Sequence, residues 1–265
     1  MKKLSLLLLL ICGYAAFGLA QGKHITILHT NDVHSQVEPD KNNMGGMVRM
    51  ATYIRQVRAA EENVLLLSAG DMFQGTPYYN LFSGAVEIEL MNAMGYDLAC
   101  LGNHEFDNGI DSLVKRLQEA KFKIITANYD VSETALRPLV KPYAILEKGG
   151  FKIGVVGVGT DLSPVSFGKN WEGIVISDAV EAANTIAKQL KEQHCDLVLC
   201  LSHIGYEEDI KLAENSRNID LIIGGHSHTF LEKPDIRKNL DGKDVPITQT
   251  GGNGKYIGRI DIRRK

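Results

Sequence analysis

The sequence predicts a mixed α/β domain in which two β-sheets are stacked between helices. Short, continuous apolar runs alternate with longer segments of helical periodicity, and such runs are typical of strands buried on both faces of a sheet. The composition, 44% hydrophobic and 23% charged over 265 residues, is that of one large globular domain with a substantial core. The net charge of −3 gives no general attraction to nucleic acid, so a stable nucleic-acid partner is not expected.

Residues 1–20 are predicted to be a secretory signal peptide outside this fold. Lys2 and Lys3 precede an apolar run, Leu4–Ile11, and the small residues around Ala20 suit a cleavage site. The run is too short to span a membrane, and no later segment is long and apolar enough for a transmembrane helix. We therefore expect an exported protein, periplasmic or extracellular, whose mature domain comprises residues 21–265.

The four cysteines predict neither disulfides nor a thiolate metal site. Cys12 lies in the leader, but lipid attachment prefers a small residue before the cysteine and Ile11 is large, so a lipoprotein is not expected. Cys100 and Cys200 lie inside apolar runs, and Cys195 lies just before one. An odd number of cysteines without close pairs favours small, buried side chains in the mature domain.

The first half of the domain alternates strands with helices. Between Gly46 and Ala60, apolar residues recur every three or four positions, which indicates a helix with one buried side. Further helices are expected over Val86–Met94 and Ile110–Ala120. The strands of this half are predicted at His24–His29, Val64–Leu67, Leu98–Leu101 and Lys123–Ala127.

The second half continues the pattern. Gly149 and Gly150 separate two apolar runs and predict a hairpin of Tyr143–Leu146 with Lys152–Val158. A helix is expected over Ala179–Gln193, and Asp161–Gly173, which has no periodicity, is expected to be a loop at the mouth of a site. The remaining strands are predicted at Asp196–Leu201, Leu221–Ile223, Val245–Thr248 and Lys255–Ile262.

Five of the predicted strands end in side chains that can ligate a metal. Because ligands bind beyond the carboxyl ends of the strands in open α/β sheets, these side chains are expected to gather at one edge. Each is a weak signal alone, since an aspartate after a strand is more often a turn residue and a lone histidine is more often a satisfied buried one. Their clustering carries the prediction, because five of the eight histidines are among these candidates. In chain order the candidates are Asp32, His34, Asp71, Asn103, His104, His203, His226 and His228.

The longer motifs around these residues resemble the calcineurin-like metallophosphoesterases, and within them the N-terminal catalytic domain of the 5′-nucleotidase branch. The matching segments are His29–Ser35, Gly70–Thr76, Gly102–Gly109, His203 and Gly225–His228. The resemblance covers Ile25 to about Ile262, nearly the whole mature domain. It implies a four-layer α-β-β-α sandwich.

The resemblance also implies two divalent metal ions bridged by Asp71. Asp32, His34 and His228 would complete one ligand set, and Asn103, His203 and His226 the other. In the 5′-nucleotidase branch the position of His228 often carries an amide side chain. The histidine here matches the broader phosphoesterase pattern, so we expect it to change the metal preference and not to remove the site.

The charges of such a centre suit phosphate chemistry. Two divalent ions bring four positive charges, and Asp32 and Asp71 cancel only two of them, which leaves net positive charge for a phosphoryl group. Ions held ~3.5–4 Å apart can stabilise both the attacking and the leaving side of an in-line displacement. Mixed nitrogen and oxygen ligands suit Mn, Zn, Fe or Co better than Mg or Ca, and the sequence does not choose among the first four.

By the same resemblance, His104 and Asp107 form a catalytic pair. The carboxylate would orient the ring and keep it protonated, so that His104 stabilises the phosphoryl group or assists the leaving oxygen. The alternative is that Asp107 caps the helix that begins near Gly109. Asn103 and His104 are expected to contact the substrate, and Phe73, Gln74 and Asn128 are weaker candidates for shaping the site.

The predicted function is hydrolysis of phosphomonoesters, nucleotides first, as in 5′-nucleotidases. A 2′,3′-cyclic nucleotide phosphodiesterase, a nucleotide-sugar hydrolase or a hydrolase of thiol sulfate esters would use the same metal core. Full-length 5′-nucleotidases carry a C-terminal domain that stacks the base between aromatic side chains, so a catalytic subunit that needs a separately encoded domain of that kind is a further alternative. The aromatic residues expected near the mouth form no obvious paired platform; they are Phe73, Tyr78, Tyr79, Phe167 and Trp171.

Overall fold

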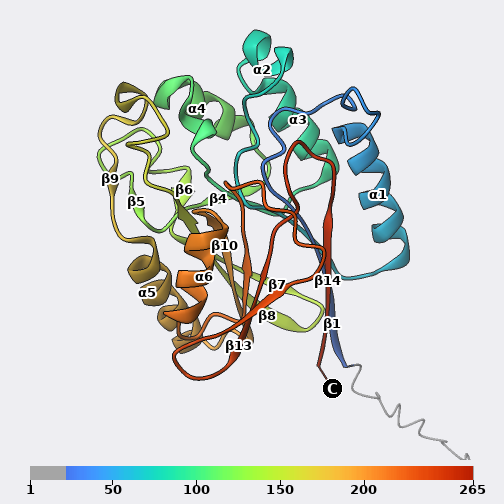
Figure 1. Ribbon diagram of the computed structural model, residues 1–265, viewed down its shortest axis with the longest axis vertical. Helices are drawn as coiled ribbons and strands as arrows, with labels where there is room; N and C mark the ends of the chain where they lie inside the picture. The colour runs from blue at the N-terminus through green and yellow to red at the C-terminus, as the bar shows by residue number, and fades with distance from the viewer. Residues whose placement is uncertain (1–21, 265) are drawn as a thin grey trace, which may run out of the picture.

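Two six-stranded sheets pack face to face, with helices on both outer faces, in the computed structural model (Figure 1). The structure describes residues 22–264. The predicted signal peptide, including Cys12, lies outside these residues. Within the described part of the chain, no helix is both long and apolar enough to cross a bilayer.

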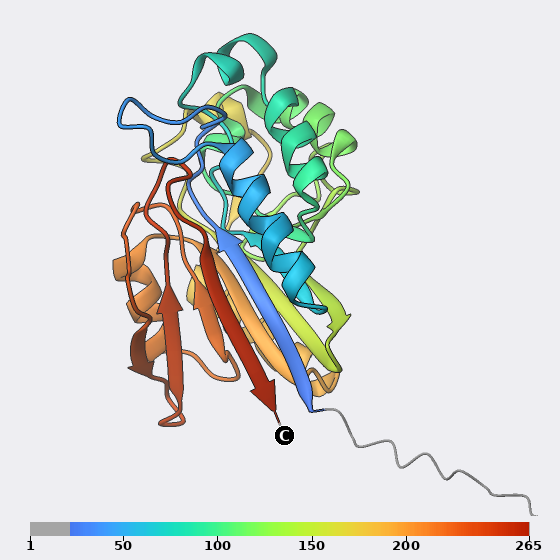
Figure 2. The same ribbon diagram turned by 90° about the vertical axis from the view of Figure 1, so that its right-hand side faces the viewer.

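The first sheet is parallel except at one edge. Its strand order is β14-β1-β2-β3-β4-β6, and β14 (Gly258–Arg264) runs antiparallel beside β1 (Figure 2). Ile27 of β1 lies opposite Leu65 on one side and Ile260 on the other. The parallel strands are β1 (Lys23–Thr30), β2 (Val64–Ser68), β3 (Leu98–Cys100), β4 (Lys123–Ile125) and β6 (Val140–Lys141).

The second sheet has four parallel strands between two antiparallel edges, in the order β12-β13-β11-β10-β8-β7. The edge strands are β7 (Tyr143–Lys148), which forms the predicted hairpin with β8, and β12 (Asp235–Lys238). The parallel strands are β8 (Phe151–Gly159), β10 (Leu197–His203), β11 (Leu221–Ile223) and β13 (Asp244–Thr248). Two further short strands, β5 (Tyr129–Asp130) and β9 (Val175–Ile176), pair with each other.

The helices divide between the two outer faces. Those that cover the first sheet are α1 (Met47–Ala60), α3 (Ala85–Met94) and α4 (Gly109–Glu119), with the short α2 (Pro77–Phe82) nearby. Those that cover the second sheet are α5 (Ala179–Glu192) and α6 (Tyr206–Glu214). Two 3₁₀ turns, η1 (His104–Phe106) and η2 (Gly168–Trp171), lie in the connections.

Alternating side chains of the central strands build the layers. Ile25 and Ile27 of β1 lie in the core between the sheets, whereas Leu28 packs under the helices. In β10, Leu199 faces the first sheet and Val198 faces α5 and α6. Successive side chains of a strand point to opposite faces of the sheet, and both faces must be apolar where the sheet is covered on both sides. The predicted α-β-β-α sandwich is therefore confirmed, and Cys100, Cys195 and Cys200 are buried free thiols.

Several element boundaries differ from the prediction. The last strand begins at Gly258 instead of Lys255, because Gly251–Ile257 forms a loop before the strand starts. Helices α2 and α6 and strand β12 were not predicted from the sequence. The Asp161–Gly173 segment is a loop as expected, apart from the η2 turn.

Candidate metal centre

The five strand ends meet at one edge of the molecule. Strands β1, β2 and β3 are parallel neighbours in the first sheet, and β10 and β11 are parallel neighbours in the second. Their carboxyl ends therefore bring side chains from both sheets to a common pocket of about 280 Å³. The pocket is lined by His34, Asp71, Gln74, Gly75, Asn103, His104, His226, His228 and Asn253.

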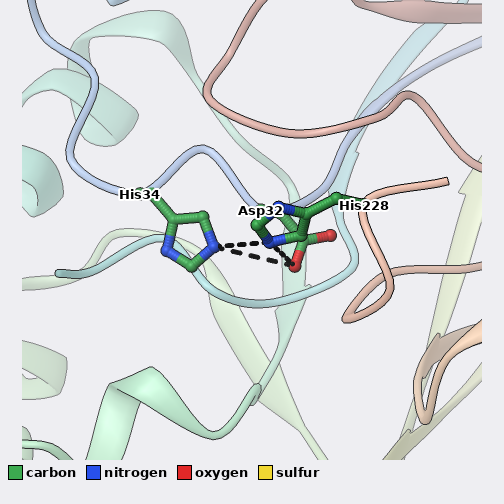
Figure 3. Close-up of side chains that lie close together, drawn as sticks. All are labelled: Asp32, His34 and His228. Carbon is green, nitrogen blue, oxygen red and sulfur yellow. Dashed lines mark hydrogen bonds and ion pairs between the residues drawn. The ribbon is translucent and has the colours of Figure 1, made fainter. Parts of the chain in front are cut away.

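One group of ligand atoms consists of Asp32, His34 and His228 (Figure 3). The Nε2 atoms of the two histidines lie 2.9 Å apart, and Asp32 Oδ1 lies 3.3 Å from His228 Nε2. His34 Nδ1 lies 3.3 Å from the carbonyl oxygen of Phe73, which turns Nε2 toward the group. Two imidazole nitrogens and a carboxylate that face one point can share a cation.

The second group consists of Asp71, His203 and His226, with Asn103 beside it. His203 Nε2 lies 3.1 Å from Asp71 Oδ2, and His226 Nδ1 lies 2.9 Å from the Asn103 side-chain oxygen. Asp71 Oδ2 is also 3.8 Å from His34 Nε2. Asp71 thus stands between the two groups, where a bridging ligand has to be.

His203 offers a direct test of whether the site fits a metal. Its Nδ1 donates to the carbonyl oxygen of Ala69 at 2.6 Å, so once the ring is neutral the lone pair on Nε2 is free to bind a cation. This nitrogen is fully buried, and although it lies near Asp71 it has no hydrogen-bond partner among the described residues. Metal-bound histidines are commonly oriented by such a second hydrogen bond to a carbonyl. The donor set therefore fits a divalent ion.

The backbone at these strand ends is unusual. Five of the seven predicted ligands have a left-handed conformation: Asp32 (φ 49°), His34 (φ 50°), Asp71 (φ 52°), His226 (φ 72°) and His228 (φ 52°). Non-glycine residues seldom adopt such angles, although aspartate and histidine tolerate them better than most, and they gather at functional sites. All five lie within a few residues of a strand end, and four of them, His34, Asp71, His226 and His228, line the pocket.

Three glycines leave room for the ligand side chains, because they have no Cβ atom. A Cβ atom on Gly102 would lie 2.2 Å from Asp71 Oδ1 and 2.8 Å from His203 Nε2. A Cβ atom on Gly225 would lie 2.8 Å from His203 Nδ1, and one on Gly70 would lie 2.7 Å from the same atom. These glycines allow the two sheets to bring their loops into contact.

The electrostatics of the second group are those of a strongly attracting pair. Burial alone would lower the pKa of His203, but the neighbouring Asp71 raises it to about 10. Burial alone would raise the pKa of Asp71, yet His203 outweighs this effect and holds the pKa well below its ordinary value. The pocket thus favours a carboxylate with positive charge beside it, a role that a divalent ion fills as well as a proton does.

His104 and Asp107 form the expected pair. His104 Nδ1 lies 2.8 Å from Asp107 Oδ2, and this hydrogen bond raises the pKa of His104 above its ordinary value. The half-buried ring lines the pocket beside that of His34, at 5.2 Å between centroids. The helix-capping alternative for Asp107 is wrong, because Asn108 occupies the cap position of α4 and no side chain caps it.

Only one of the three weaker candidates lines the pocket in the structure. Gln74 lines the pocket. Phe73 is buried in the core, where it stacks on Tyr79 with 5.6 Å between ring centroids, so neither ring lies at the mouth as predicted. Asn128 is also buried, and its amide joins the backbone of Gly159 to that of Ser177.

Two features of the site were missed from the sequence. Asn253 lines the pocket from the loop after β13, and its N–H donates to the Asp32 carbonyl oxygen at 2.7 Å. The strand β13 was predicted, but no metal-ligand motif follows it that would point to Asn253. The second lies outside the residues that line the pocket: the exposed rings of Phe230 and Tyr256 lie 4.3 Å apart between centroids, tilted by 30°, on the loops that follow β11 and β13.

The profile of the calcineurin-like phosphoesterases matches residues 25–230. The human 5′-nucleotidase is 36% identical over 282 aligned residues, which cover 96% of this chain and 49% of the relative. The structure of a Thermus thermophilus 5′-nucleotidase precursor superposes with a TM-score of 0.84 at 34% identity, covering 90% of this chain and 51% of that one. The Haemophilus influenzae NAD nucleotidase superposes with a TM-score of 0.83 at 30% identity, covering 92% and 48%. The chain spans about half the length of each of these three relatives.

We predict that Gly102→Ala abolishes metal binding, because its Cβ would displace Asp71 and His203. Manganese content after dialysis measures the effect, and at least a tenfold fall is expected, by comparison with the ~10–100-fold loss typical for partners of metal ligands. Gly168→Ala is the matched control, since a Cβ there meets nothing within 4 Å. Unchanged metal content in Gly102→Ala would contradict the crowding described here.

Proposed function

The chain belongs to the calcineurin-like phosphoesterase family, and on that basis we propose that it hydrolyses phosphate esters with two bound divalent ions, nucleotide monoesters first. The observation that carries the proposal is the meeting of two carboxylates, one amide and four imidazoles from both sheets around one pocket. Similarity to a 5′-nucleotidase and to an NAD nucleotidase supports a nucleotide substrate. A cyclic phosphodiesterase or a nucleotide-sugar hydrolase remains the alternative with the same core.

Each group of the chain has a proposed role. Bound divalent ions, Mn, Zn, Fe or Co, would supply positive charge that stabilises the transition state of phosphoryl transfer. Asp71 would contact both ions, with Asp32, His34 and His228 on one side and Asn103, His203 and His226 on the other. The Asn103 amide and the His104 ring, which line the pocket, would also hold the phosphoryl oxygens.

His104 is placed to handle a proton. Asp107 holds Nδ1 in a hydrogen bond, so a proton on the opposite nitrogen, Nε2, is available to the substrate. Because that hydrogen bond raises the pKa of His104, the ring is more often protonated near neutral pH than a free histidine. We propose that it stabilises charge on the phosphoryl group or donates the proton to the leaving oxygen.

Replacing the bridging carboxylate tests the two-metal arrangement. Asp71→Ala should be the most damaging single ligand change, because it removes a ligand from both ions. In this variant, the turnover of an aryl phosphate and the content of bound metal should fall together. Both should also fall when a chelator is added to the wild-type protein, and addition of Mn or Co should then restore activity. Near-normal turnover of Asp71→Ala with intact metal content would exclude the arrangement.

Replacing the proton-handling histidine tests a separate role. His104→Ala should retain both ions yet lower turnover by roughly 10²–10⁴-fold, the usual range for a general acid or base. Metal analysis and steady-state kinetics on the same preparation separate the two effects. If the variant loses metal, His104 is a ligand and the assignment is wrong.

Substrate selectivity of this domain should be weak. No phenylalanine, tyrosine or tryptophan lines the metal pocket among residues 22–264, so the pocket lacks the paired aromatic platform that would hold a base. Stacking contributes ~1–3 kcal/mol per base, or roughly 5- to 150-fold in discrimination. We therefore expect the chain to hydrolyse aryl phosphates nearly as well as nucleotides.

Steady-state kinetics with both substrates measure this selectivity. Addition of a C-terminal-type nucleotidase domain as a separate polypeptide should lower KM for the nucleotide much more than KM for the aryl phosphate. Strong nucleotide selectivity by the chain alone would show that its pocket is complete, and the idea of a partner domain would then be dropped.

We also propose that the protein is exported and that the catalytic domain comprises residues 21–265. The support is the leader-like composition of residues 1–20. Intact-mass analysis of protein recovered outside the cytoplasm should give a chain that begins at or near Gln21. A mass that retains Met1, or that includes lipid on Cys12, would contradict the proposal.

A further inference from the structure

Glu105 is buried beside the metal pocket but belongs to none of the candidate ligand groups among the described residues. Its Oε1 accepts hydrogen bonds from the N–H groups of Met72, at 2.8 Å, and Phe73, at 3.3 Å. Its Oε2 accepts from the N–H groups of Asp71, at 3.0 Å, and Gly102, at 2.6 Å. Four backbone donors from two loops therefore converge on one carboxyl group.

The conformation of the Asp71 loop explains this convergence. Gly70 (φ 86°) and Asp71 (φ 52°) are both left-handed and turn the chain sharply after β2. The three successive N–H groups that follow Gly70 all point to the Glu105 carboxyl group, as the amides of an anion-binding nest do. The side chain that fills the nest thus comes from the protein itself.

The same carboxyl group joins two parts of the metal centre. Glu105 follows Asn103 and His104 in the η1 turn, and it holds the backbone of Asp71 in the neighbouring loop. The Asp71 side chain is fixed independently, because its Oδ1 accepts from the His104 N–H at 3.0 Å. Two contacts therefore hold Asp71 in place relative to Asn103 and His104: the Glu105 carboxyl group holds its backbone, and the His104 N–H holds its side chain.

We propose that Glu105 is a positioning residue, whose carboxyl group fills the nest after β2 and sets the bridging Asp71 at the correct place between the two ligand groups. The inference rests on the proposed function, in which Asp71 is a metal ligand. Glutamine cannot replace Glu105, because its NH₂ group would face backbone N–H donors where an acceptor is needed.

Manganese binding to the metal-free protein, followed by the EPR signal of free Mn²⁺, tests the proposal without any substrate. Glu105→Gln should bind Mn²⁺ roughly 10- to 100-fold more weakly than the wild type, the usual loss when a group that orients a ligand is removed. Asp97→Asn is the matched control. The Asp97 carboxylate also accepts a backbone N–H of β2, that of Leu66 at 2.8 Å, but it lies before β3, at the end away from the pocket.

Both variants should lower the melting temperature of the metal-free protein, and only Glu105→Gln should weaken Mn²⁺ binding. If Glu105→Gln binds Mn²⁺ as the wild type does and loses only thermal stability, as Asp97→Asn does, Glu105 is merely structural and the proposal is overturned. If Glu105→Gln does not fold, Glu105→Asp, with its shorter reach, takes its place with the same expectation. Absence of Mn²⁺ binding by the wild type would overturn the metal centre itself, which distinguishes the two failures.

Discussion

The candidate metal centre depends on how closely the two sheets approach each other at the carboxyl ends of their strands. His203, at the end of β10, donates to the Ala69 carbonyl of the first sheet and reaches Asp71 with its other nitrogen. Gly70 and Gly225 leave the room that this approach needs. Because close-packed layers transmit small displacements, a shift of one sheet against the other would move His203, His226 and His228 away from Asp32, His34 and Asp71 together. The spacing of the sheets therefore sets the geometry of the whole centre.

The sequence predicts the clustering of these side chains because of a general property of parallel strands. An apolar run followed by Asp, His or Asn gives both the strand and the position of its functional end, so the convergence of Asp71 with His203 could be expected from the order of the motifs. The inter-sheet core was predictable for the same reason, since runs such as Leu197–Leu201 are apolar on both faces. The fold and the side chains of the candidate centre thus follow largely from the pattern.

The rest depends on contacts that leave no periodic signal. The first turn of α6 contains three acidic residues, Glu207, Glu208 and Asp209. Asp209 is fully buried on the inner side of the helix, so the sequence of this segment looks polar even where the helix faces the core. The α2 helix has only six residues, too few for apolar side chains to recur with a helical period, and its one local signal is the cap that Thr76 forms before Pro77. The role of Glu105 depends on the left-handed turn at Gly70, a conformation that a strand-ending glycine permits but does not specify.

The pairing of β14 with β1 has a consequence for how the chain folds. Lys23 lies opposite Arg264, so the first strand of the sheet finds one of its two neighbours only in the last described segment. Until that segment arrives, β1 presents an unpaired edge on which other chains can add, and closing so long a loop slows folding. A nascent chain would therefore spend its most aggregation-prone period with this edge open.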